Sequence, residues 1–95
     1  MADPLTAHAA VATERPERYA KQLVSHLGRK AEVREEPTGS RLVLGDGSCL
    51  VVPGDGVLDL RAEAPDPESL QLVQNVIGSH LVRFGDKDEL VVDWS

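Results

Sequence analysis

The C-terminal third of the chain constrains its fold more than any other stretch. Residues 66–85 carry apolar side chains at helical spacing, which predicts one amphipathic helix. Asp66 is suited to cap this helix, and Pro67 is tolerated in its first turn. Residues 89–94 alternate between apolar and polar side chains, which predicts a final strand. The apolar stripe of the helix consists of Leu70, Val73, Ile77, Leu81 and Phe84.

The N-terminal third predicts a strand followed by a second helix. Residues 5–12 alternate weakly, which favours a short strand. Thr13 offers a cap for a helix over residues 14–27, and Pro16 is acceptable in the first turn, where backbone amides have no helical partners. Gly28 is expected to end this helix.

Between the helices the apolar period changes to two, which is typical of strands. The pattern predicts strands over residues 31–36, 41–44, 48–52 and 57–64, with a tight hairpin at residues 45–47. The last of these strands alternates most cleanly, and one apolar face combined with one polar face indicates an antiparallel sheet that is buried on one side. The apolar face of that strand consists of Leu58, Leu60, Ala62 and Ala64.

The predicted order is β-α-β-β-β-β-α-β. Strands in succession together with two helices predict an α+β two-layer sandwich, in which both helices cover one face of an antiparallel sheet. A chain of 95 residues is expected to form a single domain over residues 1–95. Residues 1–4 are expected to be a flexible start.

The composition excludes several classes of function. The formal net charge of −6 argues against a nucleic-acid partner, because such proteins neutralise phosphates with Lys and Arg. No apolar stretch is long enough to span a bilayer, so no membrane partner is expected. Cys49 is the only cysteine, so the chain forms no disulfide with itself. With no recognisable signal peptide, these features predict a soluble cytoplasmic protein.

Two histidines are the main candidates for chemistry. His26 lies on the apolar face of the first predicted helix, and His80 flanks the stripe of the second. If the helices pack side by side on the sheet, the two rings approach each other. Together with Cys49, these residues are of the types that bind zinc or iron, but their spacing matches no local metal motif. No metal or other cofactor is therefore assigned, and packed core histidines remain the alternative.

The sequence gives no constellation that supports an enzyme. Cys49 follows a hairpin and has no helix N-terminus behind it to activate its thiol, so a buried, inert cysteine is expected. The acidic residues of the predicted strands point to solvent and form no catalytic pair. The glycine-rich segments at residues 45–47 and 54–56 have the spacing of turns and not of phosphate loops.

Several short phrases, in order and with their spacing, resemble the bacterial domain of unknown function family 2218. The similarity extends over about residues 7–94. The phrases that carry it are residues 13–19, residues 21–23 with His26, residues 47–50, residues 80–84, and Glu89-Leu90 with Trp94.

The resemblance implies a small stand-alone bacterial protein, sometimes associated with or joined to siderophore-interacting flavin reductases. It therefore implies a link to iron or siderophore use, with such a reductase as a partner. The chain departs from the family pattern in two places. Relatives often have a second cysteine near Val24, and an aromatic residue or histidine where this chain has Gly28 and Arg29. The missing cysteine weakens the idea of a two-cysteine metal or redox site.

Two hypotheses for the function follow. The first is a binding or accessory domain linked to iron or siderophores, with a site between the helices and the sheet. Tyr19, His26, His80 and Arg83 are its expected lining, with Tyr19 as a ring wall and Arg83 as an anion clamp. The alternative is a protein-interaction module that docks on a partner enzyme through a sheet edge or an acidic surface.

Overall fold

A computed structural model describes residues 3–95, so residues 1 and 2 of the expected flexible start lie outside the described part. The strands form one antiparallel sheet in the order β1-β5-β4-β3-β2. They are β1 (Leu5–Ala12), β2 (Glu32–Glu36), β3 (Gly39–Leu44), β4 (Gly47–Pro53) and β5 (Val57–Ala64). The helices are α1 (Pro16–Leu27) and α2 (Pro67–Phe84).

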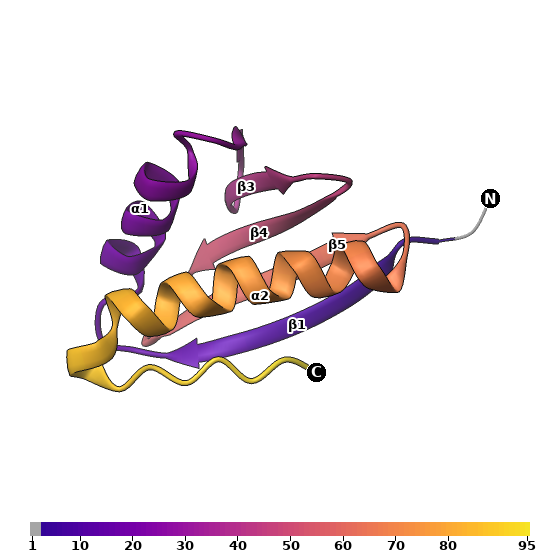
Figure 1. Cartoon of the computed structure of the whole chain (residues 1–95). Helices are drawn as coiled ribbons and strands as arrows, with labels where there is room; N and C mark the ends of the chain where they lie inside the picture. Colours follow the sequence, from indigo (N-terminus) through magenta and orange to yellow (C-terminus); the bar gives the residue numbers. More distant parts are fainter. Residues whose placement is uncertain (1–2) are drawn as a thin grey trace.

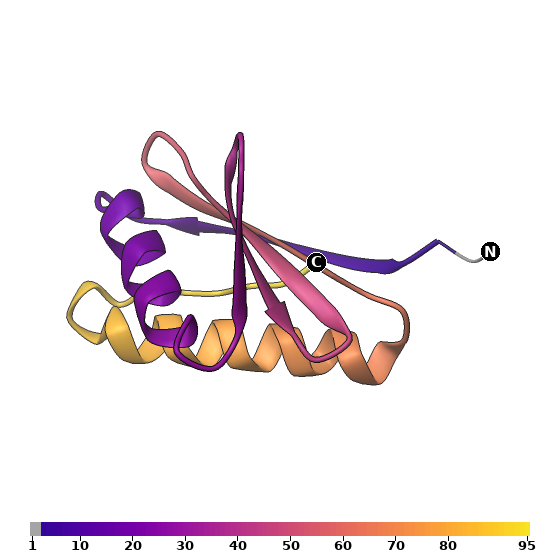
Figure 2. The same cartoon turned by 90° about the horizontal axis from the view of Figure 1, so that it is seen from above.

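Both helices lie on the same face of the sheet, which confirms the predicted α+β sandwich (Figures 1 and 2). The alternation of β5 is the one predicted, with its apolar side chains buried beneath the helices and its charged side chains on the open face. The same face of β1 carries small and β-branched residues, which lets α2 lie close to the strand. The largest fully buried side chains are Leu23, Leu42, Leu58, Leu60, Ile77 and Leu81.

The two helices begin differently. α2 begins at Pro67, and the carboxylate of Asp66 accepts a hydrogen bond from the amide of Ser69 at 2.7 Å, as expected for a cap. α1 begins at Pro16, two residues later than the sequence predicted. The hydroxyl of Thr13 accepts a hydrogen bond from the amide of Arg15 at 3.0 Å, so it stabilises the turn before the helix and caps no helical amide.

The β3–β4 hairpin projects toward α2. Its turn consists of Gly45 and Asp46, with Leu44 and Gly47 paired across it. Gly45 has a φ of 64°, a left-handed conformation that favours glycine. A Cβ atom at Gly47 would lie 2.8 Å from Cγ2 of Val73, so α2 crosses the start of β4 at close range.

The predicted final strand at residues 89–94 is wrong. A 3-10 turn at Asp86–Asp88 follows α2, and Glu89 has a left-handed φ of 53°. The segment then runs beside α2 and β1 (Figure 1). Among residues 3–95 it bonds to the sheet backbone at one point, where His8 and Ser95 exchange hydrogen bonds of 3.1 and 2.9 Å.

The side chains of this segment explain why it forms no ladder. Leu90 is buried directly against Gly85, and Val92 and Trp94 lie near Gly78 of α2. The predicted alternation of inward and outward residues is correct, but the inward residues pack on the helix, which holds most of the backbone away from β1. No helix within residues 3–95 has the length and apolar character needed to cross a membrane.

Candidate functional site

A cleft opens where the end of α1, the middle of α2 and the β3–β4 hairpin meet. Its volume is about 520 Å³. Three separate segments form its walls, so it exists only because α1 and α2 pack side by side on the same face of the sheet. Its apolar lining includes Leu27, Leu44, Leu72 and Val76, and its polar lining consists of His26, Arg29, Lys30 and His80.

His26 and His80 meet at this cleft. Their ring centroids are 5.1 Å apart, and the ring of Phe84 lies 5.4 Å from that of His26 and 5.9 Å from that of His80. Nδ1 of His80 forms a hydrogen bond of 2.6 Å with the carbonyl oxygen of Val76, one turn earlier in α2. Because a carbonyl only accepts, Nδ1 carries the proton and Nε2 of the neutral ring remains available to a ligand.

The charges that line the cleft are all basic. Arg29 and Lys30 follow directly after α1, and neither forms an ion pair with a carboxylate among residues 3–95. Within residues 3–95, no acidic side chain lines the cleft, although the whole protein has a net charge of −6.

One wall of the cleft is an apolar side chain that the protein covers only by half. Leu72 of α2 is 50% exposed, and its Cδ2 atom would lie 3.8 Å from a Cβ atom placed on Gly45 at the hairpin turn. Val76, one turn further along α2, is half-buried beside it. A concave surface with an apolar wall and a few polar groups is typical of a small-molecule site.

The structure brings together two of the four residues predicted to line the site. Tyr19 is buried, and its hydroxyl donates a hydrogen bond to Asp88 in the turn after α2. That hydrogen bond, assisted by burial, raises the pKa of Tyr19 above its ordinary value. Arg83 lines a different hollow, between α2 and the C-terminal segment, where Trp94 forms part of the wall. Of the four predicted residues, His26 and His80 line the cleft, and Tyr19 and Arg83 do not.

Cys49 is not a third ligand beside the histidines. Its side chain is fully buried on β4, and burial raises the pKa of its thiol to about 12. The protein therefore keeps this thiol protonated and inert at neutral pH. Within residues 3–95, no group of three or more His, Cys, Asp or Glu side chains is arranged to hold a metal ion.

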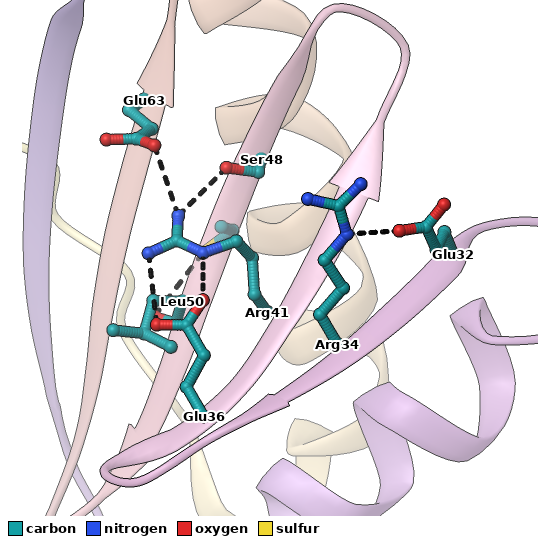
Figure 3. A network of polar contacts seen from close by, with 8 residues as sticks. Glu32, Arg34, Glu36, Arg41, Ser48, Leu50 and Glu63 are labelled. Atoms are coloured by element: carbon teal, nitrogen blue, oxygen red, sulfur yellow. Dashed lines mark hydrogen bonds and ion pairs between the residues drawn. The ribbon is translucent and has the colours of Figure 1, made fainter.

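The open face of the sheet carries a polar network (Figure 3). It lines a further hollow of about 760 Å³. The guanidinium of Arg41 donates to the carboxylate of Glu36, to the hydroxyl of Ser48 at 3.0 Å and to Glu63 at 3.3 Å, so it links four strands. Its hydrogen bond to Glu36 holds the pKa of that carboxyl below its ordinary value. Leu50, opposite Arg41 in the ladder, is buried on this face. The partners of Arg41 lie within the protein, which indicates a role in holding the sheet together.

Sequence reasoning did not assign the basic pair or the apolar wall to the site. In the sequence, Arg29 and Lys30 are accounted for by their position at the end of the first helix. Only the fold shows that they line the same cleft as the histidines. Leu72 lies off the apolar stripe of α2, and a large apolar residue outside the stripe is a signal that was available. The position of the hairpin opposite Leu72 was not readable from local patterns.

Comparison with known proteins agrees with the fold. A family model described as "Uncharacterized protein conserved in bacteria (DUF2218)" matches residues 8–95. A solved structure described as "NMR structure of PA4090 from Pseudomonas aeruginosa" is 30% identical in sequence, with a TM-score of 0.78, over 95% of this chain and 94% of that one. No curated protein matches the chain. The match over nearly the whole length shows that the chain belongs to this family of uncharacterised bacterial proteins.

Proposed function

We propose that this protein binds a small organic anion in the cleft between α1, α2 and the β3–β4 hairpin. The observation that carries the proposal is the charge of the cleft. His26, Arg29, Lys30 and His80 line it and no carboxylate does, although acidic residues outnumber basic ones in the chain. A local basic site in an acidic protein attracts anions and orients them as they approach.

The arrangement of the lining suggests how the ligand lies. Its anionic group faces Arg29 and Lys30, whose flexible side chains donate charge-assisted hydrogen bonds. Its apolar body covers the exposed side of Leu72 and the neighbouring Val76. The volume of about 520 Å³ lies within the usual range of roughly 300–1,000 Å³ for small-molecule sites. An aromatic or branched carboxylate has this combination of charge and apolar surface.

The proposed link to iron or siderophores fits this ligand class. Catecholate and carboxylate iron chelators are small anions with apolar rings or chains, so the cleft is chemically suited to them or to their building blocks. A siderophore-interacting reductase is then the proposed partner, and the cytoplasm the proposed location. The charge of the cleft supports the ligand class, while the partner and the location rest on the expectations drawn from the sequence.

Docking of a partner through a sheet edge has less support. β2 lies at one edge of the sheet, and four of its five residues are charged, a composition that discourages pairing with another strand. At the other edge, β1 is bonded at His8 to Ser95 of the C-terminal segment. The acidic surface carries no feature that favours one partner chemistry. The cleft is therefore the better-supported site.

A titration with benzoate, followed by backbone amide NMR of protein freed of metal ions on a chelating resin, tests the proposal. Benzoate carries one carboxylate on an apolar ring, and benzyl alcohol is its uncharged counterpart. We expect saturable shifts at residues of the cleft with benzoate and much smaller ones with benzyl alcohol. Shifts that are equal for the two compounds, or that lie outside the cleft, contradict the proposal.

A pair of charge-matched variants makes the test specific. The double substitution Arg29→Gln with Lys30→Gln removes two positive charges at the cleft. The double substitution Arg61→Gln with Lys87→Gln removes the same charge elsewhere. We expect the first to raise the dissociation constant of benzoate at least about fivefold, the effect of roughly 1 kcal/mol. If both double variants lose the same affinity for benzoate, the net charge of the protein explains the loss and the proposal is overturned.

A further inference from the structure

The rings of His26 and His80 are spaced like two ligands of one metal ion. Zn–N bonds of about 2.0–2.1 Å, directed at a tetrahedral angle, place two imidazole centroids about 5 Å apart. The observed distance between the centroids is 5.1 Å. The two rings come from separate helices, and the fold brings them together. We propose that His26 and His80 together bind a divalent metal ion of the zinc type at the mouth of the cleft.

The hydrogen bond of His80 has the pattern of a metal-binding histidine. A ligating histidine commonly donates its second ring N–H to a carboxylate or a backbone carbonyl, which fixes the tautomer and orients the ring. Nδ1 of His80 does this with the carbonyl oxygen of Val76 at 2.6 Å. Nε2 is thereby left as an acceptor, the form in which imidazole binds metal. His26 is exposed, so its ring has room to turn toward the same ion.

The ring of Phe84 supports the same arrangement. It lies in edge-on contact with both imidazoles, at 5.4 Å from His26 and 5.9 Å from His80. An apolar neighbour keeps water from one side of the pair. Because α1 contributes His26 and α2 contributes His80, a shared ion cross-links the two helices.

Two protein ligands leave coordination positions open. Zinc sites with open positions take water or a ligand from solution. Arg29 and Lys30 line the same cleft and repel a bare cation, so an anion that reaches both the ion and the basic pair offsets the repulsion. This last step rests on the proposed function. It identifies the ligand class as an anion able to bind metal, such as a hydroxycarboxylate or a catecholate.

Titration with Zn²⁺ alone tests the metal site. The readouts are calorimetry and long-range ¹H–¹⁵N spectra of the histidine side chains in uniformly labelled protein. We expect His26 and His80 to respond together, with metal at Nε2 of His80 and the proton retained at Nδ1. Spectra in which neither ring responds to Zn²⁺, or in which His80 binds through Nδ1, overturn the proposal, and this readout needs no variant.

Matched variants assign the site. His26→Gln and His80→Gln are each expected to raise the Zn²⁺ dissociation constant at least about tenfold. His8→Gln is the control, because His8 lies on β1 on the open face of the sheet and pairs with Asp59. Melting curves in EDTA check that each variant is folded. An equal loss in the His8→Gln variant, or no loss in the other two, contradicts the proposal.

The two proposals fail separately. The benzoate titration is performed on metal-free protein, so it does not depend on a metal ion. The Arg29→Gln/Lys30→Gln variant should keep its response to Zn²⁺, or strengthen it, while losing benzoate. Salicylate, which chelates, should bind more tightly with Zn²⁺ present than without it, and by linkage should tighten Zn²⁺ binding by the same factor. If salicylate weakens Zn²⁺ binding to the protein at an equal concentration of free Zn²⁺, the proposal that the anion contacts both the metal ion and the basic pair is wrong.

Discussion

The hydroxyl of Tyr19 donates a hydrogen bond to the carboxylate of Asp88, which ties α1 to the turn that follows α2. The ring of Tyr19 is buried in the core, so the contact joins the core to the start of the C-terminal segment. Burial of a hydroxyl is favourable only while it has a partner. Tyr19, expected to be a wall of the site, lies in the core and outside the lining of the cleft.

Removal of this hydroxyl should destabilise the protein. Tyr19→Phe is expected to lower the free energy of unfolding by about 1.5–3 kcal/mol, the usual value for a hydrogen bond to a charged group. Asp88→Asn keeps an oxygen that accepts the bond and should have a smaller effect. Urea unfolding measures both. Full stability of Tyr19→Phe contradicts a structural role for the contact.

The same contact should be visible at alkaline pH. The pKa of Tyr19 is raised in the folded protein, first by the hydrogen bond to Asp88 and then by burial. Because the unfolded tyrosine loses its proton near its ordinary pKa of 10.0, stability is full below that pH and falls as the pH rises above it. Unfolding measured from pH 8 to 11.5 should show this loss in the natural protein and less of it in Tyr19→Phe.

Burial of Cys49 should cause a second loss of stability at alkaline pH, which begins at a lower pH than that of Tyr19. Burial raises the pKa of its thiol from 9.0 to about 12. The unfolded protein loses this proton first, so stability should fall by about 1.4 kcal/mol per pH unit within this interval. Cys49→Ala should remove this slope while leaving the later effect of Tyr19. At pH 8 the native thiol should react with a disulfide reagent only as fast as the protein unfolds, and rapid stoichiometric reaction contradicts its burial.

The C-terminal segment packs against two glycines, Gly85 and Gly78, and alanine is expected to have opposite effects on stability at the two positions. A Cβ atom at Gly85 would overlap the side chain of Leu90, so Gly85→Ala should displace a buried leucine and cost about 2–4 kcal/mol. Gly78 is inside α2, where a Cβ atom would lie 3.5 Å from Nε1 of Trp94, an ordinary contact. Gly78→Ala should therefore stabilise the helix by up to about 1 kcal/mol.

Hydrogen exchange at Ser95 reads out the same prediction. Its amide donates to the carbonyl of His8 at 2.9 Å, which is the point where the segment joins β1. Exchange should become faster in Gly85→Ala and should not become faster in Gly78→Ala. Unchanged exchange in Gly85→Ala means that Leu90 does not hold the segment in place.

The sequence was most informative where a local rule decides the structure. Asp66 and Pro67 begin α2, and Val57–Ala64 forms the strand with the face that was predicted, because caps and period-two burial depend on nearby residues. Residues 89–94 show the limit of such rules. An alternating pattern indicates which side of an extended segment is buried. It does not distinguish a strand in a sheet from an extended segment that packs on a helix.

The site was predictable only in part for a similar reason. The approach of His26 to His80 followed from helices packed side by side, which the pattern of both helices favoured. The separation of Tyr19 and Arg83 from the two histidines could not be predicted in this way. It arises because the turn after α2 reaches back to Tyr19 and the C-terminal segment creates a second hollow beside Arg83. Contacts of this kind depend on where the chain returns in space.

Leu72 provides a test of the apolar wall of the cleft. Leu72→Ala should raise the dissociation constant of benzoate about three- to tenfold, because it removes surface that the ligand covers. Its effect on stability should be small, since the side chain is 50% exposed in the free protein. Val82→Ala is the matched control, because Val82 is also 50% exposed on α2 and lines the other hollow. Equal losses of affinity in the two variants place the ligand elsewhere.

The most direct test of the binding proposal is to locate the ligand itself. Intermolecular NOEs between the ring protons of benzoate and the methyl groups of isotope-labelled, metal-free protein report contacts in solution and need no variant. The proposal predicts NOEs to the methyl groups of Leu72 and Val76 in the cleft. NOEs confined to Leu50 and Val52 on the open face of the sheet, or to Val82 and Val92 beside the C-terminal segment, contradict it.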